Sequence, residues 1–373
     1  MSQIHIGTPR LAVTPPLILK KNSHIEPSKG PVSGNIVLFG KENKKIDFPG
    51  EKPPETFEEF IKHIPLESQV LQVSRGKKPA LALRYWHRKG QKEMVEKAKG
   101  PVVLFVPGLG GRTEWATPLV DQVLDEHPLI YGLDTQVLGD DPVKRGHLKS
   151  RRDLVDELNA AVEYLSNKHD GDVYLGGISL GALTITHLLA DKPKRVKGAI
   201  LINPAYRPAG SSFDPLFYLR TSTRYLLEQL GLSKPRPLSM PYQDDAEVSE
   251  EMAWVKEAKS QVSSLSATSF VELGKMTFLE SFAKAKRVFQ PVLMFVAGKD
   301  TICDPKAMVH GYNLMPSQKK TLHHVEDAHH NMIFESHMAL LAKQMKDWLT
   351  ALKKEHAPKF GALFRSEPEK RAA

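Results

Sequence analysis

The sequence predicts an α/β fold in which helices cover both faces of a mostly parallel sheet. Six short runs are largely apolar, which is typical of strands buried on both faces; they are residues 102–106, 129–133, 172–177, 199–202, 292–296 and 320–325. Between them lie segments such as 154–165 and 338–352, in which apolar residues recur at the 3.6-residue helical period. Strands that alternate with helices indicate a parallel sheet, because each parallel connection needs a crossover.

The core divides into two segments of the chain. It begins near residue 67, where "SQVLQVS" and "ALALRYW" flank "RGKKP" and predict two strands joined by a turn. The interval between the fourth and fifth apolar runs is rich in Phe, Leu, Met and Ser and is too long for a bare connection. We therefore expect a core of residues 67–205 plus 288–357, with a mainly helical cap inserted over 206–287.

The two ends of the chain differ from this core. Residues 1–66 contain nine of the 27 prolines and show no sustained period, so we predict a flexible, mostly extended N-terminal extension. Within it, "ETFEEFIKHI" (55–64) predicts one amphipathic helix. Residues 358–373 are polar and basic, which predicts a flexible tail.

Composition limits the partners and the compartment. The chain has 52 Lys and Arg against 43 Asp and Glu, a net charge of +9 that is spread out and predicts no nucleic-acid partner. The surplus favours peripheral contact with an anionic membrane or acidic substrates, or it serves only solubility.

The single cysteine, Cys303, excludes an internal disulfide and fits a reducing compartment. No apolar run approaches the roughly 18 residues of a membrane span. The first residues lack a signal-peptide pattern, so we expect a cytoplasmic protein; no protein partner follows from the sequence.

The motif Gly177-Ile178-Ser179-Leu180-Gly181 places a serine between an apolar run and an Ala- and Leu-rich helical segment. A serine on such a tight strand-to-helix turn takes a strained backbone, and the residues two before and two after it must be small to let strand and helix approach. The turn presents the hydroxyl clear of the sheet. Ser179 is therefore the candidate nucleophile; the alternative is that the glycines only line a packing turn.

A serine hydroxyl needs a base to take its proton, and the base needs an acid to orient it. Asp300 follows the strand in "VLMFVAGKDTICDP", and the strand "KTLHHV" runs into "EDAHH". Loops at the carboxyl ends of parallel strands are where such sheets bind ligands. Asp300 and Asp304 are the candidate acids, and His329 and His330 the candidate bases.

Together, "GISLG", "AGKDTICDP" and "EDAHHNMIFE" resemble serine hydrolases of the α/β-hydrolase superfamily, and among them the monoacylglycerol lipase and lysophospholipase group, which is serine aminopeptidase S33-like. The resemblance extends over residues 67–352 and implies the α/β-hydrolase fold. In that group the catalytic histidine follows an alanine by two positions and precedes a glutamate by five, as His330 follows Ala328 and precedes Glu335. His329 satisfies neither spacing.

The resemblance also places the acid of the triad at Asp300. Asp304 precedes Pro305, so we interpret it as the cap of the next helix. Cys303 matches a position where relatives can carry cysteine near the pocket; the alternative is a small buried apolar residue.

Two backbone N–H groups are expected to form the oxyanion hole. One is that of Leu180, directly after the nucleophile, and matching the family loop onto "VPGLGG" gives Leu109 as the other. The chain departs from many relatives at Pro107 and Ile178, where they carry histidine. Neither change removes a backbone donor, and the second departs from the Gly-His that many lipases of the group carry before the serine.

The octapeptide "HHVEDAHH" (323–330) raises the alternative of a metal site. His323 and His324 are neighbours on a predicted strand, so their side chains point to opposite faces, and no H-E-x-x-H spacing is present. We therefore expect one catalytic histidine with three bystanders, of which His329 lies nearest the pocket, and neither a metal nor a cofactor.

The function that these residues and the resemblance imply is a serine hydrolase of the carboxylesterase or lipase type. Its expected substrates are mono-acyl lipids, monoacylglycerol or lysophospholipid, or related medium-chain esters, with the cap as a hydrophobic lid. The same triad also serves amide or peptide hydrolysis and acyl transfer in this superfamily. From a different class, the remaining alternative is a lipid-binding protein without catalysis.

Overall fold

The computed structural model describes residues 35–39, 57–135, 146–209, 215–234, 238–239, 264–334 and 337–356. The predictions for the rest of residues 1–66, for the middle of the insertion and for the tail at 358–373 lie outside these residues.

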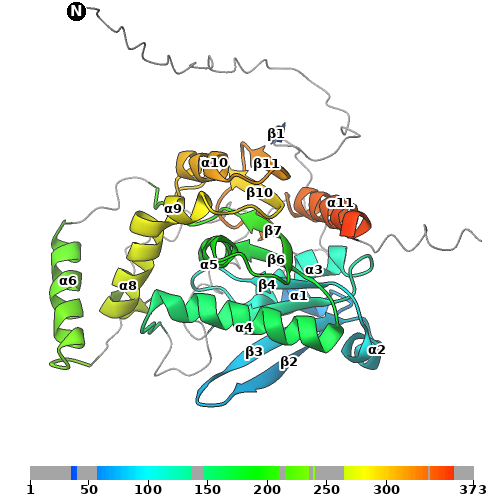
Figure 1. Cartoon of the computed structure of the whole chain (residues 1–373), viewed down its shortest axis with the longest axis horizontal. Helices are drawn as coiled ribbons and strands as arrows, with labels where there is room; N and C mark the ends of the chain where they lie inside the picture. The colour runs from blue at the N-terminus through cyan, green and yellow to red at the C-terminus, as the bar shows by residue number, and fades with distance from the viewer. Residues whose placement is uncertain are drawn as a thin grey trace, which may run out of the picture. The chain divides into compact units, whose positions relative to one another are not determined.

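Strands and helices alternate along most of the described chain (Figure 1). The strands are β1 (Asn35–Phe39), β2 (Glu67–Arg75), β3 (Lys78–His87), β4 (Val102–Val106), β5 (Ile130–Asp134), β6 (Val173–Ile178), β7 (Val196–Ile202), β8 (Leu238–Ser239), β9 (Ser264–Leu265), β10 (Val292–Ala297) and β11 (Lys320–Val325). The α-helices are α1 (Phe57–Lys62), α2 (Lys92–Lys97), α3 (Thr117–Val123), α4 (Arg151–His169), α5 (Leu180–Ala190), α6 (Pro215–Gln229), α8 (Ala267–Gly274), α9 (Ser281–Ala285), α10 (Pro305–Leu314) and α11 (Met338–His356). Three other helical pieces are the 3₁₀-helices η1 (Thr113–Ala116) and η7 (Met332–Phe334) and the π-helix η6 (Lys275–Glu280).

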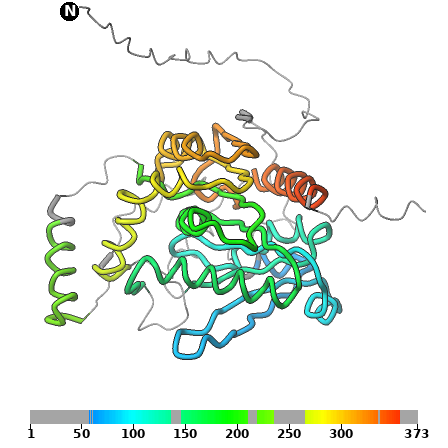
Figure 2. Tube along the Cα trace, viewed as in Figure 1, coloured from blue at the N-terminus to red at the C-terminus, as the bar shows by residue number. Residues whose placement is uncertain are grey.

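Nine of the described strands form one sheet in the order β1-β11-β10-β7-β6-β4-β5-β3-β2. The pairs from β1 to β5 in this order are parallel, whereas β3 pairs antiparallel with both β5 and β2. The predicted mostly parallel sheet is confirmed, and the six predicted runs correspond to β4, β5, β6, β7, β10 and β11. The C-terminal strands lie beside the central ones although they are far apart in sequence (Figure 2).

Alternation along the central strands supplies both faces of the sheet with apolar side chains. In β4, all five residues are buried. Leu104 packs in the cluster that contains the buried residues of α4 and α5, whereas Val103 and Phe105 pack in the cluster that contains those of α3 and α11. Successive side chains of a strand point to opposite faces, so a strand covered by helices on both sides must be apolar throughout.

The structure adds β1, which the sequence pattern does not predict. β1 pairs in parallel with β11, from Asn35 opposite Thr321 to Phe39 opposite Val325. The predicted helix within 55–64 is confirmed as α1. Among the described residues, no helix is both long and apolar enough to cross a membrane.

The helix α4 begins at Arg151 because Ser150 and Asp153 form a capping box. The Ser150 hydroxyl accepts a hydrogen bond from the Arg152 N–H at 3.2 Å, and the Asp153 carboxylate accepts one from the Ser150 N–H at 3.2 Å. These bonds satisfy N–H groups that have no partner within the first turn. The cap also fixes where the Arg151 side chain leaves the helix.

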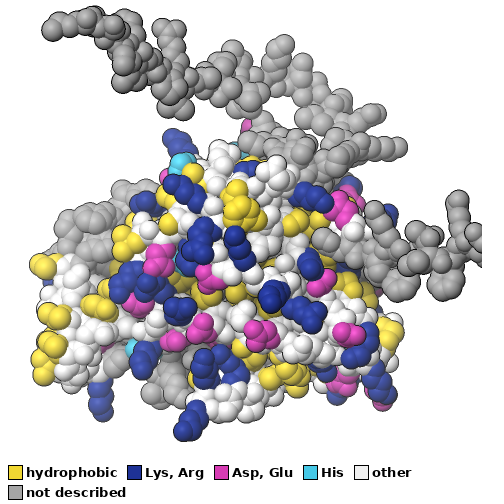
Figure 3. Space-filling model, viewed as in Figure 1, with side chains coloured by type: hydrophobic (Ala, Val, Ile, Leu, Met, Phe, Trp, Pro, Cys, Tyr) yellow, Lys and Arg dark blue, Asp and Glu magenta, His cyan; other side chains and the backbone are white. Residues whose placement is uncertain are grey.

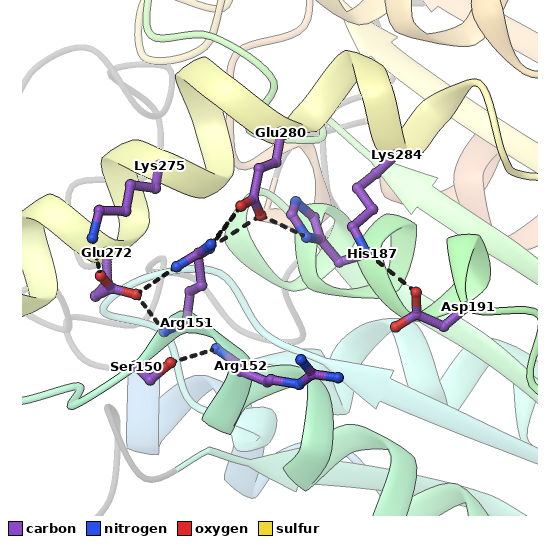
Figure 4. A network of polar contacts seen from close by, with 9 residues as sticks. All are labelled: Ser150, Arg151, Arg152, His187, Asp191, Glu272, Lys275, Glu280 and Lys284. Carbon is purple, nitrogen blue, oxygen red and sulfur yellow. Dashed lines mark hydrogen bonds and ion pairs between the residues drawn. The ribbon is translucent and has the colours of Figure 1, made fainter.

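Described elements between β7 and β10 are mainly helical, and Arg151 links two of them, α8 and η6, to the core (Figure 4). Its guanidinium donates to Glu280 at 2.5 and 3.0 Å and to Glu272 at 3.0 Å. Lys275 donates to Glu272 at 2.5 Å, and His187 of α5 lies 3.7 Å from Glu280. One network therefore joins α4 and α5 to α8 and the π-helix η6.

Burial and pairing set the charges in this network. Hydrogen bonding from Arg151 lowers the pKa of Glu280. Burial alone would raise the pKa of Glu272, but hydrogen bonds from Lys275 and Arg151 outweigh it and the pKa is lowered. Burial lowers the pKa of His187 to about 4, so the ring is neutral at pH 7.

We expect the Arg151→Met variant to lose roughly 1–3 kcal/mol of unfolding free energy. The change removes a cation from Glu280 and from Glu272, whose side chain is only 8% exposed, and an uncompensated buried carboxylate is costly. The loss stays below the ~3–5 kcal/mol of fully buried pairs because Lys275 still faces Glu272. Urea denaturation measures the difference.

The matched control is Lys97→Met, which removes an exposed pair with Glu93. It should change the unfolding free energy by less than about 0.5 kcal/mol. Equal effects of the two substitutions would contradict the importance of the Arg151 network.

Candidate active site

Each predicted catalytic residue follows one of five neighbouring parallel strands. In sheet order these are β11, β10, β7, β6 and β4. His330 lies in the loop after β11, Asp300 after β10, Ser179 directly after β6, and Leu109 after β4. Carboxyl ends of parallel strands meet at one edge of a sheet, so residues scattered over the sequence are brought to one place.

Ser179 occupies a strained turn between β6 and α5. Its backbone has φ 52° and ψ −114°, a conformation that residues with a Cβ rarely adopt. The peptide groups around it are held by the neighbouring strand: the Ser179 N–H donates to the Ile202 carbonyl at 2.9 Å, and the Ser179 carbonyl accepts from the Ala205 N–H at 3.1 Å. The side chain of Ser179 itself is only slightly exposed.

The two glycines of the motif allow this turn by close approach. A Cβ on Gly177 would lie 2.7 Å from the Ile185 side chain and 2.9 Å from the Ala182 nitrogen. A Cβ on Gly181 would lie 2.2 Å from the Val106 carbonyl oxygen. The predicted steric reason for the glycines is confirmed at both positions.

Asp300 and His330 form a buried hydrogen-bonded pair. The His330 Nδ1 lies 2.7 Å from the Asp300 Oδ2, and the two side chains are 5% and 0% exposed. The other carboxylate oxygen accepts from the N–H groups of Ile302 at 2.9 Å and Cys303 at 2.8 Å. A carboxylate only accepts, so Nδ1 donates the proton of this bond, which leaves Nε2 as the ring nitrogen that can take a proton.

Backbone contacts hold the acid loop against the base loop. The Gly298 N–H donates to the Val325 carbonyl at 2.8 Å, and the Lys299 N–H donates to the Ala328 carbonyl at 2.9 Å. A Cβ on Gly298 would lie 2.4 Å from the Glu326 carbonyl oxygen. Only glycine allows this approach, which places Asp300 and His330 within hydrogen-bonding reach.

The other candidate acid and the other candidate base in these two loops are not members of the Asp300–His330 pair. Asp304 caps α10 by accepting from the Lys306 N–H at 2.9 Å, which confirms the predicted cap. The imidazole that meets Asp300 belongs to His330, while His329 is partly exposed. Cys303 is buried and packs in the apolar core. Glu335, used in the family spacing, lies outside the described residues.

The loop after β4 lies against Ser179, the candidate nucleophile. A Cβ on Gly108 would be 3.1 Å from the Cβ of Ser179. Leu180 is the first residue of α5, where N–H groups have no acceptor within the helix and the helix dipole favours negative charge. The oxyanion role of the Leu109 and Leu180 N–H groups stays a prediction that fits these positions.

Two polar residues at this edge of the sheet escape prediction from the sequence. Asp134 ends β5, and its carboxylate accepts from the Thr113 N–H and hydroxyl, both at 2.8 Å, which anchors the far end of the loop after β4. Asn203 directly follows β7. The sequence signal common to both is a polar residue at the carboxyl end of an apolar strand. The neighbouring strands in the sheet carry the candidate site residues.

The remaining histidines of 323–330 have separate environments. His323 stacks on the ring of Phe295, with centroids 5.2 Å apart, and burial lowers its pKa to about 4. His324, its neighbour on β11, is less buried. Within the described ranges, no three His, Cys, Asp or Glu side chains are placed to share a metal ion.

A family model of serine aminopeptidase S33 matches residues 97–337, which contain all these candidate residues. The chain belongs to the serine aminopeptidase S33 family. This S33 protein is a hydrolase with the α/β-hydrolase fold, and the resemblance seen in the sequence is confirmed. None of the curated proteins compared with the chain matches it.

Solved structures share the fold of this S33 hydrolase at low sequence identity. A soluble variant of the monoglyceride lipase of Saccharomyces cerevisiae has a TM-score of 0.62 and 16% identity, covering 77% of this chain and 95% of its own. The monoacylglycerol lipase of Paleococcus ferrophilus has a TM-score of 0.57 and 19% identity, covering 68% and 97%. A thermophilic esterase of Thermogutta terrifontis has a TM-score of 0.55 and 18% identity, covering 76% and 99%.

We expect Gly181→Ala to lower the unfolding free energy by more than about 2 kcal/mol, because the new methyl group overlaps the backbone of β4. Gly274→Ala is the matched control: nothing lies within 4 Å of a Cβ there, so the substitution should be neutral or stabilise by up to about 1 kcal/mol. Guanidinium denaturation compares the two variants. Equal stability of both would contradict the close approach at Gly181.

Proposed function

We propose that this S33 hydrolase is a carboxylic ester hydrolase that works through an acyl-enzyme on Ser179. The observation that carries the proposal is the buried Asp300–His330 pair at the sheet edge where Ser179 stands on its strained turn. Such a pair supplies an oriented base, and such a turn presents a hydroxyl at the start of a helix.

In the proposed reaction, the Ser179 hydroxyl oxygen attacks the ester carbonyl carbon while His330 Nε2 takes its proton. Asp300 keeps the ring oriented and balances the imidazolium charge. The N–H groups of Leu109 and Leu180 stabilise the oxyanion. The intermediate expels the alcohol, which receives the proton from His330. Water then attacks the acyl-enzyme with the same base and releases the acid.

The substrates that we propose are mono-acyl lipids, monoacylglycerol or lysophospholipid, or related medium-chain esters. Support comes from the fold shared with a monoglyceride lipase and a monoacylglycerol lipase, and from the described part of the insertion, which is mainly helical and lies between β7 and β10 in the chain. The family name favours a second candidate, hydrolysis of aminoacyl amides by the same residues. Both reactions pass through an acyl-enzyme and differ in the leaving group.

A fluorophosphonate probe should form an adduct on Ser179, located by mass spectrometry, and Ser179→Ala should abolish it. His330→Gln and Asp300→Asn should lower kcat on esters by roughly 10³-fold or more, because either change removes the base or its orientation.

Neighbours in the same loops provide matched controls. Asp304→Asn keeps a good helix cap and His329→Gln leaves the Asp300 pair intact, so both should keep at least about a third of the activity.

The wild type and these variants are assayed on acyl esters of increasing chain length, monoacylglycerol, lysophospholipid and aminoacyl anilides. Turnover of the lipids over the anilides supports the proposal, and the reverse preference supports the amide candidate. A folded wild type that forms no adduct and binds lipid without turnover would contradict both and favour the binding protein.

We also propose peripheral contact with an anionic lipid surface through α6. Leu219, Leu226 and Leu230 are 64%, 57% and 62% exposed, and hydrophobic side chains gather over α6 (Figure 3). A spacing of seven residues brings Leu219 and Leu226 to one side of α6. Leu230 directly follows the helix, and its N–H donates to the Leu226 carbonyl at 3.0 Å. Arg220 and Lys234 are exposed nearby, and cations beside exposed apolar residues match anionic headgroups.

The double variant Leu226→Ser/Leu230→Ser should bind vesicles containing phosphatidylserine at least about tenfold more weakly, since two leucines no longer enter the lipid. Co-flotation measures binding. Val70→Ser is the control, because Val70 is 43% exposed but lies on β2. Wild-type binding that the double variant retains would contradict the role of α6.

A further inference from the structure

Asn203 connects the loops that carry the three candidate catalytic residues. It follows β7, which lies between β6 and β10 in the sheet, and its side chain is 0% exposed. Its Nδ2 donates to the carbonyl oxygen of His330 at 2.7 Å, and its Oδ1 accepts from the N–H of Ala297 at 2.8 Å. One partner only accepts and the other only donates, so the amide orientation is fixed by chemistry.

The backbone around Asn203 reaches the nucleophile. The Asn203 N–H donates to the Phe295 carbonyl of β10 at 3.0 Å. The preceding carbonyl, of Ile202, accepts from the Ser179 N–H at 2.9 Å, and the Ala205 N–H donates to the Ser179 carbonyl at 3.1 Å. The segment from Ile202 to Ala205 therefore contacts the peptide groups on both sides of Ser179, while the Asn203 side chain contacts the acid strand and the base loop.

The hydrogen bond from Asn203 holds the main-chain carbonyl of His330 and not its ring. Within His330, the Asp300 carboxylate holds the ring at Nδ1, which is the far end of the side chain and not the main chain from which it starts. Asn203 instead holds the main-chain carbonyl of His330, which fixes where the side chain starts. The two contacts therefore hold the His330 residue at its main chain and at the far end of its side chain.

We infer that Asn203 is a positioning residue that sets the place of His330 relative to Ser179. Its side-chain hydrogen bonds go to main-chain atoms of His330 and Ala297, so it acts through the His330 main chain. The inference rests on the proposed function, in which His330 is the base. A displacement of about 1 Å in a catalytic group is enough to slow a reaction on the order of 10²-fold.

Backbone geometry offers a competing reason for asparagine at this position. Asn203 has φ 45°, in the left-handed region where asparagine is tolerated better than most residues. Asn203→Gly separates the two reasons, because glycine accepts this φ and removes the amide. Asn203→Asp keeps the shape and the acceptor for Ala297 but replaces the donor to His330 with an oxygen.

The test measures kcat and KM on an ester for wild type, Asn203→Gly and Asn203→Asp, with active sites titrated by the fluorophosphonate. Per titrated site, we expect both variants to lose about 10- to 100-fold in kcat, with KM within about threefold of wild type. Thr186→Val is the matched control. It removes an equally buried hydrogen-bonding hydroxyl, 0% exposed and 3.0 Å from the Tyr206 hydroxyl, and should lower Tm without changing kcat per titrated site.

A merely structural role predicts a different result: a lower Tm and fewer titratable sites, with unchanged kcat per site. That result, or failure of both Asn203 variants to fold, overturns the inference. A wild type that titrates normally while the variants keep full kcat rejects the positioning role and leaves the proposed function standing. A folded wild type with no titratable serine rejects the proposed function itself.

Discussion

The backbone of Ser179, held at a positive φ between β6 and α5, is the constraint on which the rest of the site depends. Such a conformation costs on the order of 1–3 kcal/mol for a residue with a Cβ, and it persists only where surrounding structure enforces it. Here the enforcement comes from backbone packing. The glycines before and after the serine let α5 and the end of β4 approach closer than any side chain allows, and the end of β7 binds the serine peptide groups.

The order of the strands in the sheet brings the other candidate residues to the same edge as Ser179. Ser179, Asp300 and His330 lie far apart in sequence, but the strands that precede them are neighbours or near neighbours in one parallel sheet. Contact between the acid and base loops at Gly298 then fixes the position of the Asp300 loop relative to the His330 loop. Burial then strengthens the Asp300–His330 bond, because a low local dielectric favours a charge-assisted hydrogen bond.

The sequence predicts the features that have short-range causes. The core strands are recognisable because burial on both faces makes each of them apolar, and the turn at Ser179 because its steric requirement spans five residues. Asp304 is recognisable as a helix cap from the proline that follows it. The choice of His330 over His329 needed the family spacing, since nothing local separates two adjacent histidines.

Features with long-range causes escaped prediction. Asn203 looks like any polar residue after a strand, and its side chain contacts the main chain of His330, 127 positions away. Arg151 meets Glu280 across 129 positions, which no local pattern records. β1 lies in a proline-rich stretch without a period, and its strand form depends on the edge that β11 offers.

A crystal structure of the protein after reaction with a fluorophosphonate would test the proposed nucleophile and its surroundings most directly. We expect phosphorus bonded to the Ser179 Oγ, with the phosphoryl oxygen about 3 Å from the N–H groups of Leu109 and Leu180. His330 Nε2 should face the Ser179 Oγ. Phosphorus on another residue, or a phosphoryl oxygen turned away from both N–H groups, would contradict the site described above.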